Sequence, residues 1–229
     1  VSYTSNDPQD PTNFLPSFTA HKIWTFQVGA SIRFGQKYLS YPDRKSNVNN
    51  SAYPSVYIGY KKLFGANDSQ KNSDVLFTQL NQHSTLGNLG DFTYRVKGGF
   101  FLKKKNVSFI DYAHFNGNKL AISPAVGTLN NFNLLDYYAY STNDKYTEIH
   151  TEYNFKGFIL NKIPLLNRLN FHVVAGAKGL FTSDRKPYTE ASIGVDNIGW
   201  GKWRFLRVDY VRSINGPNQD GAFVFGLSF

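Results

Sequence analysis

The chain of 229 residues contains neither cysteine nor methionine. Without cysteine it has no disulfide framework, no thiolate metal site and no cysteine nucleophile, and it fits an oxidising compartment in which free thiols are a liability. It also lacks any run of about 18 apolar residues, which excludes a transmembrane helix. Segments rich in Leu, Ala and Glu, typical of helices, are missing as well. These absences leave a chain built from strands.

Aromatic side chains are abundant, at 17% of the chain, with 20 Phe, 15 Tyr and 3 Trp beside 19 Gly. Such a composition excludes intrinsic disorder and favours an all-β fold. The formal charge of +9 comes from 25 basic and 16 acidic residues, which are scattered apart from one run at 103–105. Because no nucleic-acid-binding motif accompanies this charge, we expect no nucleic-acid partner, and an anionic membrane surface fits better.

Polar and apolar residues alternate with a period of two in nine segments of about 10 to 14 residues, which predicts nine strands. Soluble strands usually stop near about 5–6 residues, whereas strands of this length can cross a bilayer at a tilt. The predicted strands cover 22–35, 55–64, 75–86, 90–103, 146–158, 169–181, 188–198, 203–213 and 220–229.

One face of these strands is apolar and often ends in an aromatic residue, as an aromatic girdle would. The other face carries full charges beside small Gly and Ser, which suits a water-filled lumen better than the core of a soluble sandwich. The sequence therefore predicts an all-β, antiparallel transmembrane β-barrel of the outer-membrane type. The side chains expected to face lipid are Trp24, Phe26, Val28, Ile149, Tyr153, Phe155, Phe171, Val173, Ile193, Val208, Phe223 and Phe225.

We expect residues 1–229 to form a single β-barrel domain, in which 1–21 are an outer loop or lead-in. The stretch 104–145 is too aromatic for a solvated tip, so it is expected to be a long outer loop that folds over or into the lumen. The connection 39–54 is expected to be an inner turn. Single-chain bacterial barrels have even strand numbers, so nine strands and the absence of a leader suggest the C-terminal portion of a larger barrel. A tenth strand at 131–140 is the alternative.

The last strand has an aromatic residue at nearly every second position up to the end of the chain. Phe225, Leu227 and Phe229 resemble the C-terminal assembly signal of bacterial outer-membrane barrels, which implies the barrel assembly machinery as a partner. We expect this strand to pair with 203–213 on one side, and on the other with a strand that precedes residue 22.

Three motifs resemble a known family. They read Tyr-Thr-Glu-Ile-His-Thr-Glu-Tyr-Asn-Phe-Lys-Gly-Phe at 146–158 with Asn-Lys-Ile-Pro-Leu-Leu at 161–166, Phe-Ile-Asp-Tyr-Ala-His-Phe-Asn-Gly-Asn at 109–118, and Tyr-Thr-Glu-Ala-Ser-Ile-Gly-Val-Asp-Asn at 188–197. Together they look like the C-terminal barrel of a Bacteroidota outer-membrane family of unknown function, which carries a carboxypeptidase-regulatory-like domain at its N-terminus. The resemblance runs from about residue 22 to the end and implies a Gram-negative cell envelope.

A more distant similarity is to the BamA/TamA surface-antigen superfamily. In that superfamily a long outer loop folds into the lumen, and the penultimate strand often reads Arg-hydrophobic-Asp, here Arg207-Val208-Asp209. The loop tip, however, offers Phe115, Asn116, Gly117 and Asn118 as its lumen-loop motif, without the superfamily's arginine. The resemblance implies a role in outer-membrane biogenesis, export or transport. A passive pore or a surface receptor or structural barrel without insertase activity is the alternative.

The candidate site is a set of polar residues expected to face the lumen: Glu148, His150, Glu152, Lys178, Arg207 and Asp209. Neighbouring residues on one strand face lie about 6.6–7 Å apart, so a carboxylate at 148 or 152 could orient the imidazole of His150. A lumen hydrogen-bond network is favoured over acid–base chemistry or over a metal site of His150, His172 and Glu152. Whether these charges are simply solvated or dock the long loop is left open.

No Gly-x-Ser-x-Gly, His-Glu-x-x-His or phosphate-loop motif occurs in the chain. We therefore expect no enzymatic activity, no cofactor and no metal. The expected location is the bacterial outer membrane. The expected partners are outer-membrane lipid and lipopolysaccharide, the barrel assembly machinery and other envelope proteins.

Overall fold

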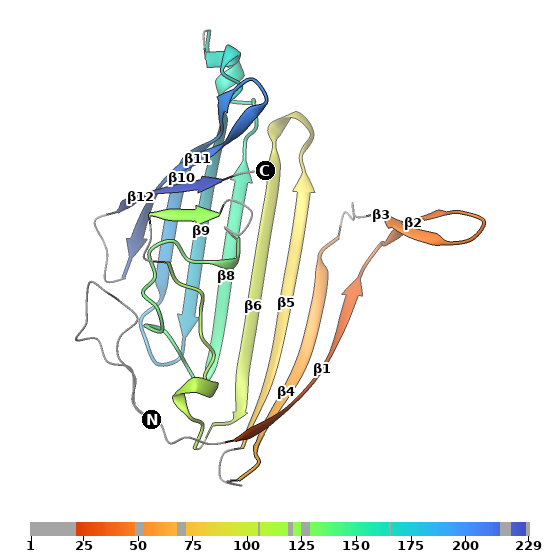
Figure 1. The fold of residues 1–229 in the computed structure, drawn as a ribbon, viewed down its shortest axis with the longest axis vertical. Coiled ribbons are helices and arrows are strands. Elements are labelled where there is room, and N and C mark those ends of the chain that lie inside the picture. Colours follow the sequence, from red (N-terminus) through yellow and green to blue (C-terminus); the bar gives the residue numbers. More distant parts are fainter. Residues whose placement is uncertain are drawn as a thin grey trace.

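The structure is a computed structural model that describes residues 22–48, 53–67, 72–104, 106–118, 121–124, 129–164, 166–215 and 221–227. Its main feature is one sheet of ten strands in the order β1-β4-β5-β6-β8-β9-β10-β11-β12-β7 (Figure 1). The long strands are β1 (Ile23–Arg33), β4 (Ser55–Gly65), β5 (Ser73–Thr85), β6 (Asp91–Lys103), β8 (Lys145–Asn154), β9 (His172–Thr182), β10 (Tyr188–Trp200), β11 (Trp203–Ile214) and β12 (Ala222–Leu227). These nine strands confirm the all-β prediction and fall where the alternation placed them.

All neighbours from β1 to β12 are antiparallel. The register keeps like faces together, since Val28 lies opposite Tyr60, Val173 opposite Val195, and Val208 opposite Phe225. A one-residue slip in any pair would send a whole apolar set to the other face. The alternation along each strand therefore becomes an alternation between the two faces of the entire sheet.

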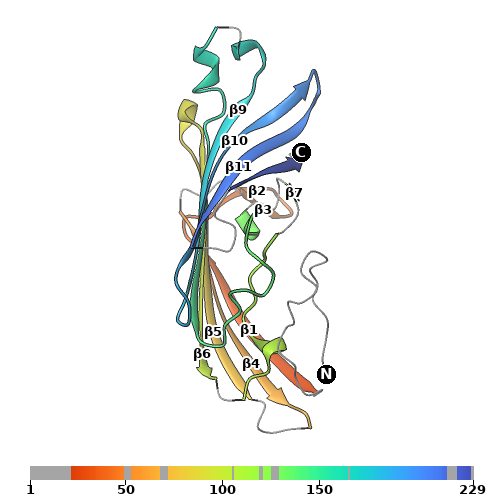
Figure 2. The ribbon, with the colours of Figure 1, turned by 90° about the vertical axis from the view of Figure 1, so that its left-hand side faces the viewer.

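The sheet is curved and open rather than closed as a barrel (Figure 2). Among the described residues β1 pairs only with β4, so the first and last long strands do not meet. Short 3₁₀ turns connect some strands, such as Gly87–Leu89, Leu160–Lys162 and Leu166–Arg168. In the part of the chain that the structure describes, no helix is long and apolar enough to span a membrane.

Two expectations about connections are wrong. The stretch 39–54, expected as an inner turn, takes part in a separate two-stranded hairpin, in which β2 (Lys37–Ser40) pairs with β3 (Lys45–Val48). The segment 131–140 is not a tenth strand but an irregular stretch with single turns. Among the described residues, the second neighbour of β12 is β7 (Ile122–Pro124), which comes from within the long loop and runs parallel to β12. The expected pairing with a strand that precedes residue 22 falls outside the described residues. An exposed strand edge carries unpaired amides, and β7 satisfies part of this edge because the Phe225 N–H donates to the carbonyl of Ala121 at 2.7 Å.

The two faces of the sheet differ in what covers them. The convex face is open, and its large apolar side chains are exposed: 63% for Trp24, 59% for Ile193 and 60% for Phe223. All members of the expected lipid-facing set that lie within strands share this face. The concave face is covered over β8 to β12 by the long loop, which contributes Phe115, Phe132, Leu134 and Leu135 to the buried core (Figure 2).

Candidate functional site: a charged concave face that holds the long loop

The concave face of β8 to β11 carries a group of buried charged side chains. Side-chain alternation brings Glu148, His150, Lys178, Arg207 and Asp209 to this face, together with Glu152 and the unpredicted Glu190. The predicted lumen-facing set is thus brought together on one face, within four adjacent strands. Burying charges is costly unless they are paired, so their partners decide what the group can do.

Glu148 is paired on two sides. Its Oε1 lies 2.6 Å from Nε2 of His150, on the same strand, and both of its oxygens lie 3.4 Å from Nζ of Lys97 on β6. His150 has no solvent exposure, and the ring of Phe132 lies over it at a centroid distance of 4.7 Å. The carboxylate therefore does orient the imidazole, but the loop closes the imidazole off from any substrate.

Arg207 is the centre of a second group. Its Nε donates to Asp209 at 2.7 Å and its Nη2 donates to Glu152 at 2.9 Å, across to β8. An arginine fork between two carboxylates is the geometry that best compensates the burial of these charges. This group connects β11 to β8 across the concave face.

Two further side chains hold the backbone of the loop. The Lys178 ammonium donates to the carbonyl of Asn131 at 2.6 Å and to Oδ1 of Asn133 at 2.8 Å. The Glu190 carboxylate accepts the N–H groups of Asn133 and Leu134, each at 2.8 Å. Charge-assisted bonds of this kind are roughly twice as strong as neutral ones. The concave face thus binds the loop through three main-chain groups and the side chain of Asn133.

Apolar packing supports these bonds on both sides. Phe132 packs edge-on against Tyr188 at 5.7 Å, and Phe115 packs edge-on against Tyr146 at 5.2 Å. Leu134 joins Val211 and Val224 in a second buried cluster. The loop is therefore docked by a charged centre surrounded by aromatic and aliphatic contacts.

The predicted lumen-loop motif holds the loop to itself more than to the sheet. The N–H of Asn118 donates to the carbonyl of Leu135 at 3.1 Å, and the carbonyl of Asn116 accepts from Phe132 at 2.8 Å. A side chain on Gly117 would collide with the Leu135 carbonyl, so this close approach requires glycine. Only Phe115 of the motif reaches into the core against the sheet.

Of the expected C-terminal signal, Phe225 and Leu227 lie on the convex face of β12, and Phe229 lies outside the described residues. They are thus separate from the charged group, which lies on the opposite face.

Comparison with known proteins shows that residues 1–195 match the C-terminal domain of a family of unknown function, DUF5686. The chain belongs to this family. The match ends within β10, so β11 and β12, and with them Arg207 and Asp209, lie beyond it. No curated protein and no solved structure matches the chain.

Within the described part of this DUF5686 domain, no group of three or more His, Cys, Asp or Glu side chains is placed to hold a metal ion. The three residues considered for a metal site are not brought together. His172 is six residues from Lys178 along β9, about 20 Å at the usual strand rise, whereas His150 lies directly opposite Lys178.

Sequence reasoning missed Lys97, Tyr188 and Glu190 as members of the charged group. The Tyr188 hydroxyl donates to Oε1 of Glu190 at 2.6 Å, and Glu190 lies directly opposite Lys178. The sequence did contain this signal, because Glu190 belongs to the alternating polar residues of β10, just as Lys178 belongs to those of β9. Once these strands are taken as neighbours in a tight hairpin, the opposite charges fall side by side.

Proposed function

We propose that this DUF5686 domain is part of the wall of a β-barrel in the bacterial outer membrane, in a protein that acts in outer-membrane biogenesis, export or transport. Its convex face contacts lipid and lipopolysaccharide, and its concave face lines the lumen and holds the long loop. The observation that carries the proposal is the convex face itself, which exposes large apolar side chains along nearly all of the long strands. They include Trp24, Phe26, Val28, Ile32, Ile58, Phe64, Leu76, Phe100, Leu102, Phe181, Ile193, Leu206, Tyr210, Phe223 and Phe225.

A soluble monomer rarely exposes a contiguous apolar patch larger than a few hundred Å². Here large apolar side chains are exposed on eight of the nine long strands, which are adjacent in the sheet, while most of the buried charges lie on the other face. Most of the long strands have 10 to 13 residues, against the ~9–11 that a tilted strand needs to cross a bilayer. Length and polarity therefore both agree with a membrane wall.

The open edge of β1 extends the proposal to a larger barrel. Unpaired backbone amides in hydrocarbon cost several kcal/mol each, so β1 requires a partner strand in a membrane. In the proposed barrel this strand comes from another chain or from residues outside the described ranges. The distant similarity of Arg207-Val208-Asp209 and the docked loop to the BamA/TamA superfamily supports a biogenesis or export role.

A passive pore or a surface receptor or structural barrel without insertase activity is the second candidate. It is favoured by the loop tip, where Asn116 and Asn118 bond to the loop's own backbone in place of the superfamily's arginine. Planar-bilayer recording of the full-length protein separates the first proposal from a passive pore. A steady open conductance from the wild type supports the passive pore, whereas a closed wild type excludes it.

The membrane location is tested by cysteine labelling, because the natural chain has no cysteine. Ile193→Cys places a thiol on the convex face, and Asp43→Cys places one in the exposed hairpin as the control. In opened outer membranes containing the full-length protein, we expect a water-soluble maleimide to label Asp43→Cys, whereas only a lipid-soluble maleimide labels Ile193→Cys. Equal labelling of both sites by the water-soluble reagent would overturn the proposal.

A further inference from the structure

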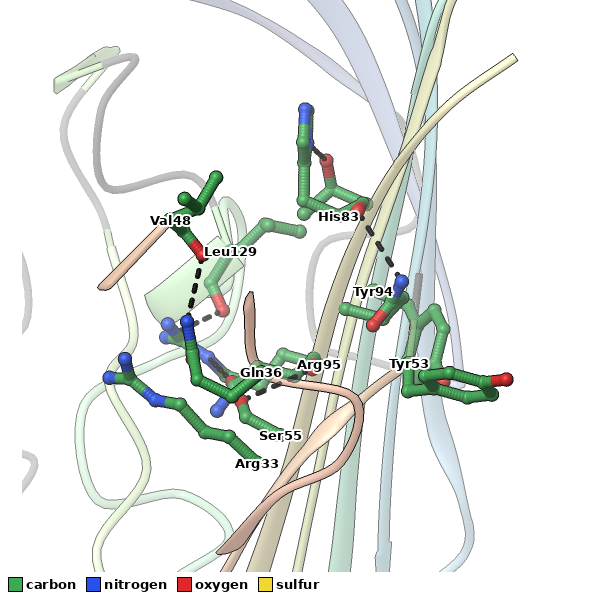
Figure 3. Close-up of a pocket in the computed structure, with 12 residues that line it drawn as sticks. Arg33, Gln36, Val48, Tyr53, Ser55, His83, Tyr94, Arg95 and Leu129 are labelled. Carbon is green, nitrogen blue, oxygen red and sulfur yellow. Dashed lines mark hydrogen bonds between the residues drawn. The ribbon is translucent and has the colours of Figure 1, made fainter. Parts of the chain in front are cut away.

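A pocket of about 420 Å³ opens on the concave face beside the charged group (Figure 3). It lies over β1, β4, β5 and β6, between the β2–β3 hairpin and Leu129 of the long loop. Ten of its twelve lining residues have polar side chains, and none of the described lining residues is Asp or Glu. The polar residues of the wall are Arg33, Gln36, Tyr53, Ser55, Asn81, Gln82, His83, Thr93, Tyr94 and Arg95.

Two arginines line this pocket at opposite ends of one row of paired residues that runs across the strands. Arg33 pairs with Ser55, Ser55 with Asn81, and Asn81 with Arg95, so the two arginines are three strands apart, about 14 Å between backbones. Figure 3 shows both side chains directed into the space above Ser55. An arginine side chain is long enough for two of them to approach one ligand across this distance.

Arg95 is held in place, whereas Arg33 is not. Nε of Arg95 donates to Oδ1 of Asn81 at 2.8 Å and Nη1 donates to the carbonyl of Leu129 at 3.4 Å. Of its five N–H donors, three therefore remain for a ligand. Arg33 is exposed and makes no hydrogen bond or ion pair with any described residue. One guanidinium is thus oriented in advance, and the other is available to close over a ligand.

Among the described residues, no carboxylate forms an ion pair with either arginine. Glu148 lies near Arg95 but is already paired with Lys97 and His150. The pocket therefore holds uncompensated positive charge at its wall. The hairpin that borders it is fixed by Gln36, whose amide donates to the carbonyl of Val48 at 2.9 Å.

We propose that this pocket binds an anion that carries a phosphoryl group. A single guanidinium fork satisfies the two oxygens of a carboxylate, whereas two forks that approach from opposite sides match the additional oxygens of a phosphate. At the floor, the Ser55 hydroxyl donates to the carbonyl of Asn81 at 3.3 Å and the Thr93 hydroxyl lies 2.9 Å from Nδ1 of His83, so the two arginines are the donors left for a ligand. The volume exceeds that of a bare phosphate and lies in the range of small-molecule sites, about 300–1,000 Å³, so it accommodates the body of a phosphorylated small molecule or lipid headgroup.

The test uses full-length protein purified in detergent without phosphate, with calorimetric titration of inorganic phosphate, a sugar phosphate and acetate. We expect both phosphates to bind more tightly than acetate. Arg33→Gln should weaken phosphate binding at least tenfold without changing the melting temperature of the ligand-free protein, because Arg33 has no structural partner among the described residues. Arg95→Lys keeps the charge but loses the fork, and should weaken binding similarly. Arg168→Gln, an exposed arginine outside the pocket, is the control and should bind as the wild type.

The source of the phosphoryl group is decided in nanodiscs that contain either a neutral lipid or added phosphatidic acid. If binding that is lost in Arg33→Gln is seen only with phosphatidic acid, the site is assigned to a lipid headgroup. If the soluble phosphates bind in neutral nanodiscs, the site is assigned to a soluble ligand. Equal affinity for acetate, no phosphate binding in any arm, or equal loss in Arg168→Gln would overturn the proposal. The outcome is independent of the cysteine-labelling test, since the pocket is present whether or not the convex face contacts lipid.

Discussion

Glu190 on β10 accepts a hydrogen bond from the backbone N–H of Asn133 at 2.8 Å, 57 residues away along the chain. The second oxygen of this carboxylate accepts a hydrogen bond from the N–H of Leu134, so Glu190 binds the main chain of the loop at two successive residues. These two bonds hold the main chain of the loop and do not depend on its side chains, whereas Lys178 also binds the side chain of Asn133. The surrounding packing of Phe132 and Leu135 then selects the register.

Replacing Glu190 by Ala is expected to release the loop. The substitution leaves two buried N–H groups without an acceptor and removes the charge opposite Lys178, so docking should weaken by about 3 kcal/mol. Hydrogen exchange of residues 131–142 should accelerate, while that of β4 and β5 stays unchanged. Asp43→Asn, which removes an exposed acid from the hairpin, is the matched control. Unchanged exchange in Glu190→Ala would contradict the docking role.

Replacing Arg207 by Ala should destabilise the whole sheet. The buried Asp209 and the half-buried Glu152 would then remain close together without their shared cation, at a cost of about 3 kcal/mol. Urea unfolding of the protein in detergent measures this loss. Arg212→Ala, an exposed position on the same strand, should change stability by less than about 0.5 kcal/mol. A similar loss in both variants would show that Arg207 acts through something other than this buried group.

An arginine in place of Ile193 distinguishes a lipid-facing wall from a surface in water. Ile193 is 59% exposed, so in water the substitution should cost within about 0.5 kcal/mol. At mid-height in a bilayer it should cost about 2–4 kcal/mol. Unfolding of protein reconstituted in lipid measures the difference, with Asn167→Arg in a turn as the control. A negligible cost at Ile193 in lipid would argue against the membrane wall.

The internal packing of the loop should depend on pH through His114. This ring lies between Phe109 and Tyr138, at 5.3 and 5.2 Å, in a residue that is still exposed to solvent. Its partial burial lowers its pKa below the ordinary value, although the Ile110 carbonyl and Asp111 favour the charged form. The folded state thus holds the proton more weakly than the unfolded state. Its contribution is complete above the unfolded pKa of about 6.5 and is lost as pH falls below that value.

Hydrogen exchange of residues 108–116, corrected for the intrinsic rate, should therefore show constant protection from pH 8 to 7 and decreasing protection toward pH 5.5. His114→Gln cannot take up the proton, so its protection should stay level over the same range. If the variant shows the same pH dependence as the wild type, another group is responsible.

The strands were predictable because alternation is a local signal that the sheet then repeats. Trp24, Phe26 and Val28 are every second residue of β1 and therefore lie on one face of the sheet. Their neighbours on β4 lie on the same face by the same alternation. The hairpin β2–β3 was missed because each of its strands has only four residues and all but one of these eight residues are exposed, so no apolar period marks it. Strand β7 was missed because three residues cannot establish a period.

The site was predictable in its face but not in its partners. The alternation of polar and apolar residues placed His150 and Lys178 on the same face, since both belong to long strands with a fixed register. What they bind could not be derived, because Asn131 and Asn133 lie in a stretch whose path depends on packing rather than on periodicity. The pocket was missed for a related reason, since Arg33 and Arg95 are 62 residues apart and are brought together only by the order of the strands β1, β4, β5 and β6 in the sheet.

Because β7 pairs in parallel with β12, it competes with any other strand for pairing at this edge of the sheet. β7 belongs to the same chain and its loop is anchored by Glu190 and Lys178, so its effective concentration at the edge is high, on the order of millimolar for a short tether. Any strand that pairs with β12 from elsewhere must displace β7 first. Because β7 pairs only with Phe225 to Leu227, an incoming strand can replace it one residue at a time. The strength with which the loop is anchored then sets how strongly the incoming strand must pair with β12 to displace β7.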